Sequence, residues 1–309
     1  MKRALLLLIV VGASALGARA ATYYVVVAGL GGEPDYEQRF TAAAKDLDRI
    51  FKAAGPTAHV YVLTGAQATA AHLAETMNEV ARNAKAEDDF ALILIGHGSF
   101  DGAEYKFNLV GPDVTAAEIA TMCDHIAARR QLIVDTTSAS GGALEAFERP
   151  GRAVIAATKS GTEKNATVFA RYWVEALEDP EADTDKSESI SAMEAFRYTT
   201  KKTGAFYDSQ KRLATEHAVF NDTGRGEAVR DAVNGQGVLM ASFTLLRLGT
   251  SQQAAKDPAK RALLEKKNEL EQEIDMLKYQ KAAMDPDDYK KQLTEALVEL
   301  AKVEEQLDQ

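Results

Sequence analysis

The sequence predicts an α/β protein built on a mostly parallel sheet, and three observations lead to this prediction. Short apolar runs, typical of buried strands, alternate with longer segments whose apolar residues recur at helical spacing. Two of these runs end in loops of small residues. The second half of the chain is mainly helical in pattern. Strands that alternate with helices pair in parallel and are covered by helices on both faces.

The alternating part of the chain extends to about residue 157. Strands are expected at 22–28, 59–63, 90–95, 132–135 and 153–157. The segments between them predict helices at 35–54, 69–84 and 115–127, and another that begins at 143. Thr115 and Glu118 have the spacing of a capping box, which marks the start of the third helix. Residues 105–110 predict a short hairpin or an extended insert.

Beyond residue 157 the pattern becomes helical. Helices are expected at 167–177 and 190–202, and the acidic stretch 178–188 between them predicts a solvated loop. The stretch 208–237 is polar and poorly periodic, so it predicts no element.

The tail predicts two heptad helices joined by a tight turn. The apolar residues of each helix follow alternating three- and four-residue steps, from Leu263 to Met284 and from Tyr289 to Leu307. Asp285 and Pro286 separate the two helices, which favours an antiparallel coiled-coil hairpin over residues 258–309. Residues 249–257 are expected to form a linker. The hairpin either pairs only with itself or serves as an arm for self-association or docking.

The first 20 residues have the pattern of a secretory signal peptide. Lys2 and Arg3 precede an apolar run, and Ala18-Arg19-Ala20 has the spacing of a cleavage site. We therefore expect an exported, periplasmic or secreted protein cleaved near Ala20, with its main domain over residues 21–248. No later run is long enough to span a bilayer.

Composition excludes several classes of partner and site. The formal net charge is -10 and no long basic run occurs, which argues against nucleic acid or anionic membrane as the main partner. The single cysteine, Cys123, cannot form an intramolecular disulfide. The 221–226 loop faintly resembles a calcium loop, but Arg225 stands where an oxygen ligand is needed. We expect no metal and no cofactor.

Two loops form the candidate site. Gly96-His97-Gly98-Ser99 follows one apolar run, and Asp135-Thr136-Thr137-Ser138-Ala139-Ser140-Gly141-Gly142 follows another. The carboxyl ends of parallel strands share one edge of a sheet, where ligands bind. The sequence therefore predicts that His97 and Ser138 lie at the same edge.

The two loops resemble those of the caspase-like (clan CD) cysteine peptidases, and the legumain-type branch most closely. The segment Leu94 to Ser99 is similar to the histidine strand of that family. Ser138-Ala139-Ser140-Gly141 lies over its Cys-x-Ser-Gly pattern, so the family's nucleophile falls on Ser138. Residues 152–158, followed by Lys159-Ser160-Gly161, are similar to the next strand and the loop that walls the substrate pocket. The resemblance covers roughly residues 22–220 and leaves out the tail.

The resemblance implies a role for each matching residue. His97 would move the proton, Ser138 would stand at the nucleophile position, and the Gly98 N–H would hold the oxyanion. The residues that would contact the substrate are Asp135, Thr158, Lys159 and Ser160. It also implies a caspase-like sheet.

A serine hydroxyl is a weak nucleophile unless a base is held against it. The first hypothesis is therefore an exported, inactive peptidase homologue that binds a peptide or protein. The alternative is a hydrolase that uses Ser138 as nucleophile and His97 as general base. Independently of these hypotheses, the hydroxyls of Thr136, Thr137, Ser138 and Ser140 also fit caps for the helix that begins near Gly142. A third hypothesis is a purely structural exported protein with no ligand.

Overall fold

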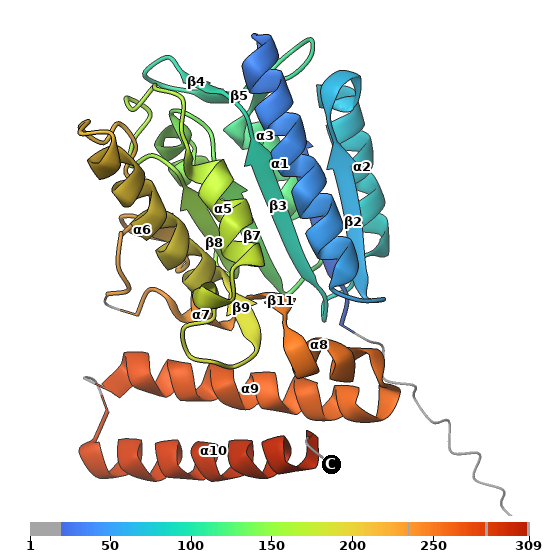
Figure 1. Cartoon of the computed structure of the whole chain (residues 1–309), viewed down its shortest axis with the longest axis vertical. Coiled ribbons are helices and arrows are strands. Elements are labelled where there is room, and N and C mark those ends of the chain that lie inside the picture. Colours follow the sequence, from blue (N-terminus) through green and yellow to red (C-terminus); the bar gives the residue numbers. More distant parts are fainter. Residues whose placement is uncertain (1–19, 234, 282–283, 308–309) are drawn as a thin grey trace, which may run out of the picture.

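A six-stranded sheet forms the centre of the molecule (Figure 1). The computed structural model describes residues 20–233, 235–281 and 284–307, and the predicted signal peptide lies almost wholly outside them. The strand order is β10-β8-β7-β3-β1-β2, in which β10 is antiparallel to β8 and the other pairs are parallel. The strands are β1 (Thr22–Ala28), β2 (Ala58–Leu63), β3 (Asp89–Ile95), β7 (Arg130–Asp135), β8 (Arg152–Ala156) and β10 (Val219–Asn221).

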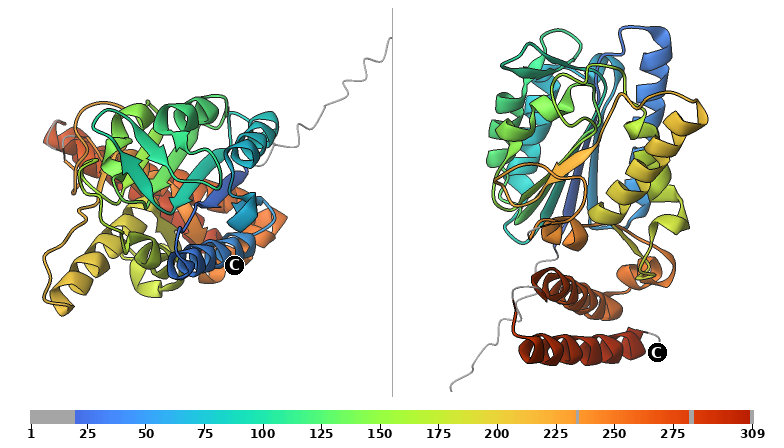
Figure 2. Two further views of the ribbon diagram at one scale, coloured as in Figure 1. Left: turned by 90° about the horizontal axis from the view of Figure 1, so that it is seen from above. Right: turned by 90° about the vertical axis from the view of Figure 1, so that its left-hand side faces the viewer.

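Helices cover both faces of this sheet, as Figure 2 shows in the view along the sheet. One face packs on α1 (Pro34–Ala53), α5 (Phe169–Glu178) and α6 (Ala192–Ser209). The other face packs on α2 (Ala70–Asn83), α3 (Ala116–Asp124) and α4 (Leu144–Phe147). The strands β1, β3, β7 and β8 are almost fully buried because both of their faces are covered, which explains their continuous apolar runs.

A small antiparallel sheet lies at the carboxyl edge of the large one. It consists of β4 (Gly98–Phe100), β5 (Tyr105–Phe107) and β6 (Val114–Thr115). The segment 105–110, predicted as a hairpin or an extended insert, thus contains the middle strand of this sheet, β5. β4 begins directly after His97 and is an edge strand, because it pairs with β5 alone.

The polar stretch 208–237 contains an element that periodicity misses. This element, β10, has only three residues and lies between two irregular segments. It pairs with β8. The remaining short elements are β9 (Ser189–Ser191), β11 (Thr244–Arg247), α7 (Val238–Ser242) and the 3-10 turns η1 (Gly65–Gln67), η2 (Ser140–Gly142) and η3 (Pro180–Ala182).

The tail lies below the sheet in Figure 1, at the end opposite β4 and β5. α9 (Pro258–Gln280) and α10 (Pro286–Leu307) pack together and run in opposite directions, as the hairpin prediction requires. α9 also contacts α7, so the hairpin does not pair only with itself. Most of the expected linker at 249–257 is helical: it contains α8 (Gly249–Lys256), which packs on α9.

The predicted fold class is confirmed: a mostly parallel sheet is covered by helices on both faces and followed by a helical hairpin. No helix in the described part of the chain has the length and apolarity needed to cross a membrane.

Candidate functional site

The strands β3 and β7 bring the two predicted loops together. They are neighbours in the sheet, and Leu94 of β3 is paired with Asp135 of β7. Both strands end at the same edge of the sheet, and Thr136 N donates a hydrogen bond to the Leu94 carbonyl at 2.9 Å. The structure thus places His97 and Ser138 at the same edge, as the sequence predicts.

Aromatic side chains of α1 hold the His97 ring. The ring centroids of Tyr36 and Phe40 lie 4.7 Å and 5.1 Å from that of His97, and both contacts are edge-to-face. The pKa of His97 is lowered, mainly because partial burial disfavours the charged imidazolium. The charge of Arg39 acts in the same direction, whereas a hydrogen bond to the Gly31 backbone opposes it. The imidazole is therefore biased toward its neutral form, which is the form that a general base needs.

The Ser138 hydroxyl is bound to the backbone of Gly98. It donates to the Gly98 carbonyl at 3.0 Å and accepts from the Gly98 N–H at 3.2 Å. Within the described residues, no hydrogen bond joins this hydroxyl to His97. Ser138 is buried, with 4% of its surface exposed. The hydroxyl at the nucleophile position and the N–H expected to hold the oxyanion are thus hydrogen-bonded to each other.

Only glycine fits at position 98. A Cβ atom there would lie 2.4 Å from the Ser138 carbonyl oxygen and 2.6 Å from Thr137 Oγ1. The first of these atoms is backbone and cannot move aside cheaply. The glycine allows the two loops to approach closely enough for the hydrogen bonds of Ser138.

A buried carboxyl group lies beneath the Ser138 loop. Asp135 Oδ1 accepts hydrogen bonds from Thr137 N at 3.0 Å and Thr137 Oγ1 at 2.7 Å, and Asp135 is fully buried. Burial raises the pKa of Asp135 to about 6, because the carboxylate is costly to desolvate. The Tyr105 hydroxyl lies 2.6 Å from Thr137 Oγ1 and completes the network.

The loop after β8 packs directly on η2. Thr158 Oγ1 accepts from Gly141 N at 2.9 Å, and Thr158 N donates to Ser140 Oγ at 3.1 Å. Asp135 and Thr158 are fully buried, and their hydrogen bonds shape the loops. That they contact a substrate stays a prediction. The side chain of Lys159 is exposed, and Ser160 is half-buried. None of the hydroxyls in the Ser138 loop caps η2 or α4. Those of Thr136, Ser138 and Ser140 bind to neighbouring segments instead.

Sequence reasoning missed a second histidine at this edge. His217 Nδ1 lies 2.5 Å from Glu163 Oε1, and Glu163 Oε2 accepts from the backbone N–H groups of His217 and Lys159. The Glu163 carbonyl accepts from Ala139 N at 2.8 Å. Glu163 thus ties three segments together beside Ser138. No local motif marks Glu163 or His217, because they are 54 residues apart in the sequence.

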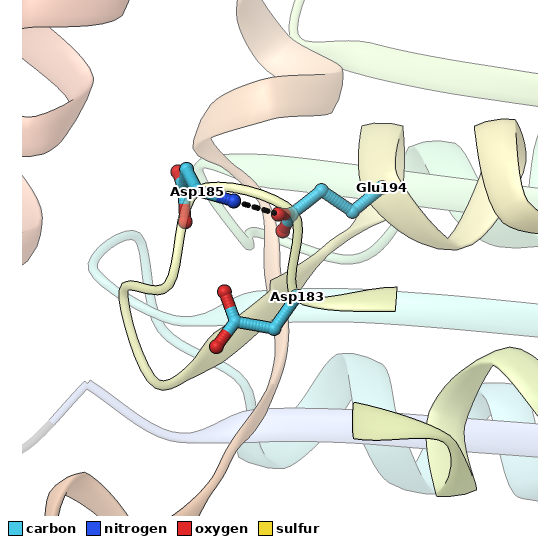
Figure 3. A group of neighbouring side chains, drawn as sticks. All are labelled: Asp183, Asp185 and Glu194. Atoms are coloured by element: carbon cyan, nitrogen blue, oxygen red, sulfur yellow. Dashed lines mark hydrogen bonds between the residues drawn. The ribbon is translucent and has the colours of Figure 1, made fainter. Parts of the chain in front are cut away.

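Three acidic side chains gather elsewhere, at the opposite end of the sheet. Asp183, Asp185 and Glu194 bring carboxylate oxygens within 4.8 Å of one another (Figure 3). Glu194 accepts hydrogen bonds from the backbone of Thr184 and Ser191, and Asp183 accepts from Ser187 and Glu188. These N–H donors point at the oxygens that a cation would need, so the group fits a loop anchor and not a metal site. It also shows that the 178–188 loop is not wholly solvated, since Asp183 is buried.

Comparisons with known proteins give weak similarities. No protein-family model and no curated protein matches this chain. Its structure is similar to the Drosophila initiator caspase Dronc, with 13% identity, 69% of this chain and 82% of that chain covered, and a TM-score of 0.43. It is also similar to a protein from Geobacter sulfurreducens, with 12% identity, 68% and 95% covered, and a TM-score of 0.44. At such TM-scores, the fold class stands on the sheet topology alone.

Proposed function

We propose that this chain is an exported, caspase-like and legumain-like peptidase homologue that binds an extended peptide or protein segment without cleaving it. The observation that carries the proposal is the double hydrogen bond between the Ser138 hydroxyl and Gly98. A nucleophile must present a lone pair to the substrate and pass its proton to a base. Here the Ser138 hydroxyl donates its proton to the Gly98 carbonyl and not to a base, and its oxygen accepts from the Gly98 N–H, which is also the expected oxyanion donor. Neither requirement is met.

The edge strand β4 supports the binding part of the proposal. β4 pairs with β5 alone, and on its other side the backbone of Gly98 is bound to Ser138, so an extended peptide can add by main-chain hydrogen bonds only to the part of β4 beyond Gly98. Ser99 in β4 and Lys159 in the loop after β8 are exposed and so accessible to a ligand.

One observation favours the alternative, a hydrolase that uses Ser138. Ala139 has a φ of 59°, in the left-handed region that favours glycine. Strained backbone of this kind is common at active sites, where surrounding contacts hold it in place. If the loop around Ala139 opened, the Ser138 hydroxyl would be free to turn toward His97.

A thiol at position 138 tests the relation to cysteine peptidases. In a Cys123→Ser background, Ser138→Cys introduces the only thiol of the chain. Sulfur is too large for the position 3.0 Å from the Gly98 carbonyl, so the thiol is expected to leave it and face the substrate side. We expect labelling by peptide electrophiles that end in acidic, basic or asparagine residues, and we expect His97→Ala to suppress it.

Ser140→Cys in the same background is the matched control. Ser140 is equally buried, but its hydroxyl faces Thr158 on the other side of Ala139. We expect no His97-dependent labelling there. A folded Ser138→Cys variant that no probe labels would contradict descent from a peptidase site.

A further inference from the structure

A cavity lies between α1 and α5, on the helix-covered face next to the candidate site. The two helices lie side by side in front of the sheet in Figure 1 and contact each other. An ion pair between Arg49 and Glu178 joins them near their carboxyl ends, with a nitrogen–oxygen distance of 2.5 Å. Nearer their amino ends, the space between them is a cavity of about 400 Å³. This volume lies within the range of small-molecule sites, which is roughly 300–1,000 Å³.

The cavity has an apolar lining. Its apolar side chains come from α1, β3, α5 and α6, and include Phe40, Ala43, Ile95, Ala170, Val174 and Phe206. The polar groups at its inner end are already satisfied, since Thr167 Oγ1 donates to the Thr136 carbonyl. An apolar chain would therefore fill this space without leaving a buried polar group unpaired.

Two arginines line the half of the cavity nearest the carboxyl edge of the sheet. Arg39 lies on α1 and Arg171 in the first turn of α5, so each wall supplies one cation. Both are exposed. Arg39 has a loose ion pair with Asp35, at 3.8 Å, and its guanidinium lies over the Tyr36 ring, 5.3 Å from the centroid. No ion pair holds Arg171 among the residues that the structure describes. At the other end of the α1 wall, Asp46 lines the cavity and is paired with Arg49 at 3.2 Å.

From this arrangement we propose that the cavity between α1 and α5 binds a small monocarboxylic acid with an apolar chain, its carboxylate between Arg39 and Arg171. The apolar lining takes the chain, and the two cations at one end take the single charge. This proposal does not depend on the proposed function of the Ser138 site.

Occupancy of the cavity is linked to His97 through shared residues. Phe40 lines the cavity and also contacts the His97 ring, and Gly96 lines the cavity one residue before His97. The charge of Arg39 lowers the pKa of His97. A carboxylate bound at Arg39 offsets that charge, so the bound acid raises the pKa of His97.

Calorimetric titration with octanoate tests the proposal. We expect saturable one-to-one binding, and binding of octanol about tenfold weaker, since the alcohol has the chain without the charge. Arg39→Gln and Arg171→Gln should each weaken octanoate binding about threefold and leave octanol unchanged. Arg82→Gln on α2, on the opposite face, is the matched control and should have no effect.

A filled cavity gives a second test. Ala170→Leu places a larger side chain in the cavity and should abolish binding of both probes. In NMR titrations, octanoate should raise the pKa of His97 and octanol should not. Equal binding of octanoate by wild type and both arginine variants would overturn the proposal. So would tighter binding of a leucine-ended peptide with a free carboxylate, which would assign the cavity to peptide ends instead.

Discussion

At the scale of single residues, close approach of two loops defines the site. The hydroxyl of Ser138 and the backbone of Gly98 satisfy each other, and the geometry depends on the missing side chain at position 98. The sequence could predict that His97 and Ser138 share an edge, because alternating strands and helices give parallel strands whose carboxyl ends lie at one edge of the sheet. It could not predict where the Ser138 hydroxyl points, since that depends on a contact between loops 40 residues apart.

Gly98→Ala should destabilise the protein by about 3 kcal/mol, because the new methyl group overlaps the Ser138 carbonyl oxygen. Chemical denaturation followed by circular dichroism measures this change. Gly204→Ala is the matched control: it lies in α6, where a Cβ atom meets nothing within 4 Å. That substitution should stabilise the helix by up to about 1 kcal/mol. Equal effects of the two substitutions would refute the close approach.

Asp135 should make stability depend on pH. Its pKa is raised from 3.8 to about 6 in the folded state, so the folded protein holds a proton that the unfolded chain releases. The stability from this group is therefore full below about pH 4 and is lost as pH rises through about 6. Asp135→Asn should remove this loss, which amounts to about 1 kcal/mol between pH 5 and pH 7.

The control for this prediction is Asp101→Asn. Backbone N–H groups of Glu104 and Ala103 lower the pKa of Asp101, so it stays charged across this range and its substitution should not change the profile's slope. A wild-type profile with the same slope as Asp135→Asn would contradict the raised pKa.

At the scale of elements, local signals predicted helix starts well and short strands poorly. The capping box of α3 is present as expected: Thr115 Oγ1 accepts from Glu118 N, and Glu118 accepts from Thr115 N. Such signals lie within four residues, so the sequence alone contains them. β10 and α8 were missed because tertiary contacts stabilise them: β10 pairs with β8, and α8 packs on α9.

Thr115→Ala should cost about 1 kcal/mol, because the first turn of α3 loses its cap. Thr121→Ala in the same helix is the control. Its hydroxyl is exposed and bonds only to the Ala117 carbonyl, so we expect a change within about 0.5 kcal/mol. Thermal unfolding of the two variants compares them directly, and an equal loss would show that the cap contributes nothing.

At the scale of the whole molecule, the hairpin is part of one packed structure and lies far from the candidate site. α9 contacts α7, α8 and α10, and Ile274 is buried in it. Ile274→Ala should therefore cost about 2–4 kcal/mol. Met276→Ala, two residues on and exposed, should cost less than about 0.5 kcal/mol.

Trp173 reports whether the hairpin and the sheet domain unfold together. It is the only tryptophan and is fully buried beside the sheet. We expect its fluorescence and the circular dichroism of Ile274→Ala to change at the same denaturant concentration. A separate, earlier transition that leaves Trp173 unaffected would show that the hairpin is an independent unit.

Turnover of peptide reporters tests the central claim, that Ser138 is bound to Gly98 and does not act as a nucleophile. Wild type and His97→Ala are assayed side by side with reporters that end in acidic, basic and asparagine residues. The structure predicts that wild type releases product no faster than His97→Ala. Histidine-dependent turnover that Ser138→Ala also abolishes would contradict the claim and establish a serine hydrolase.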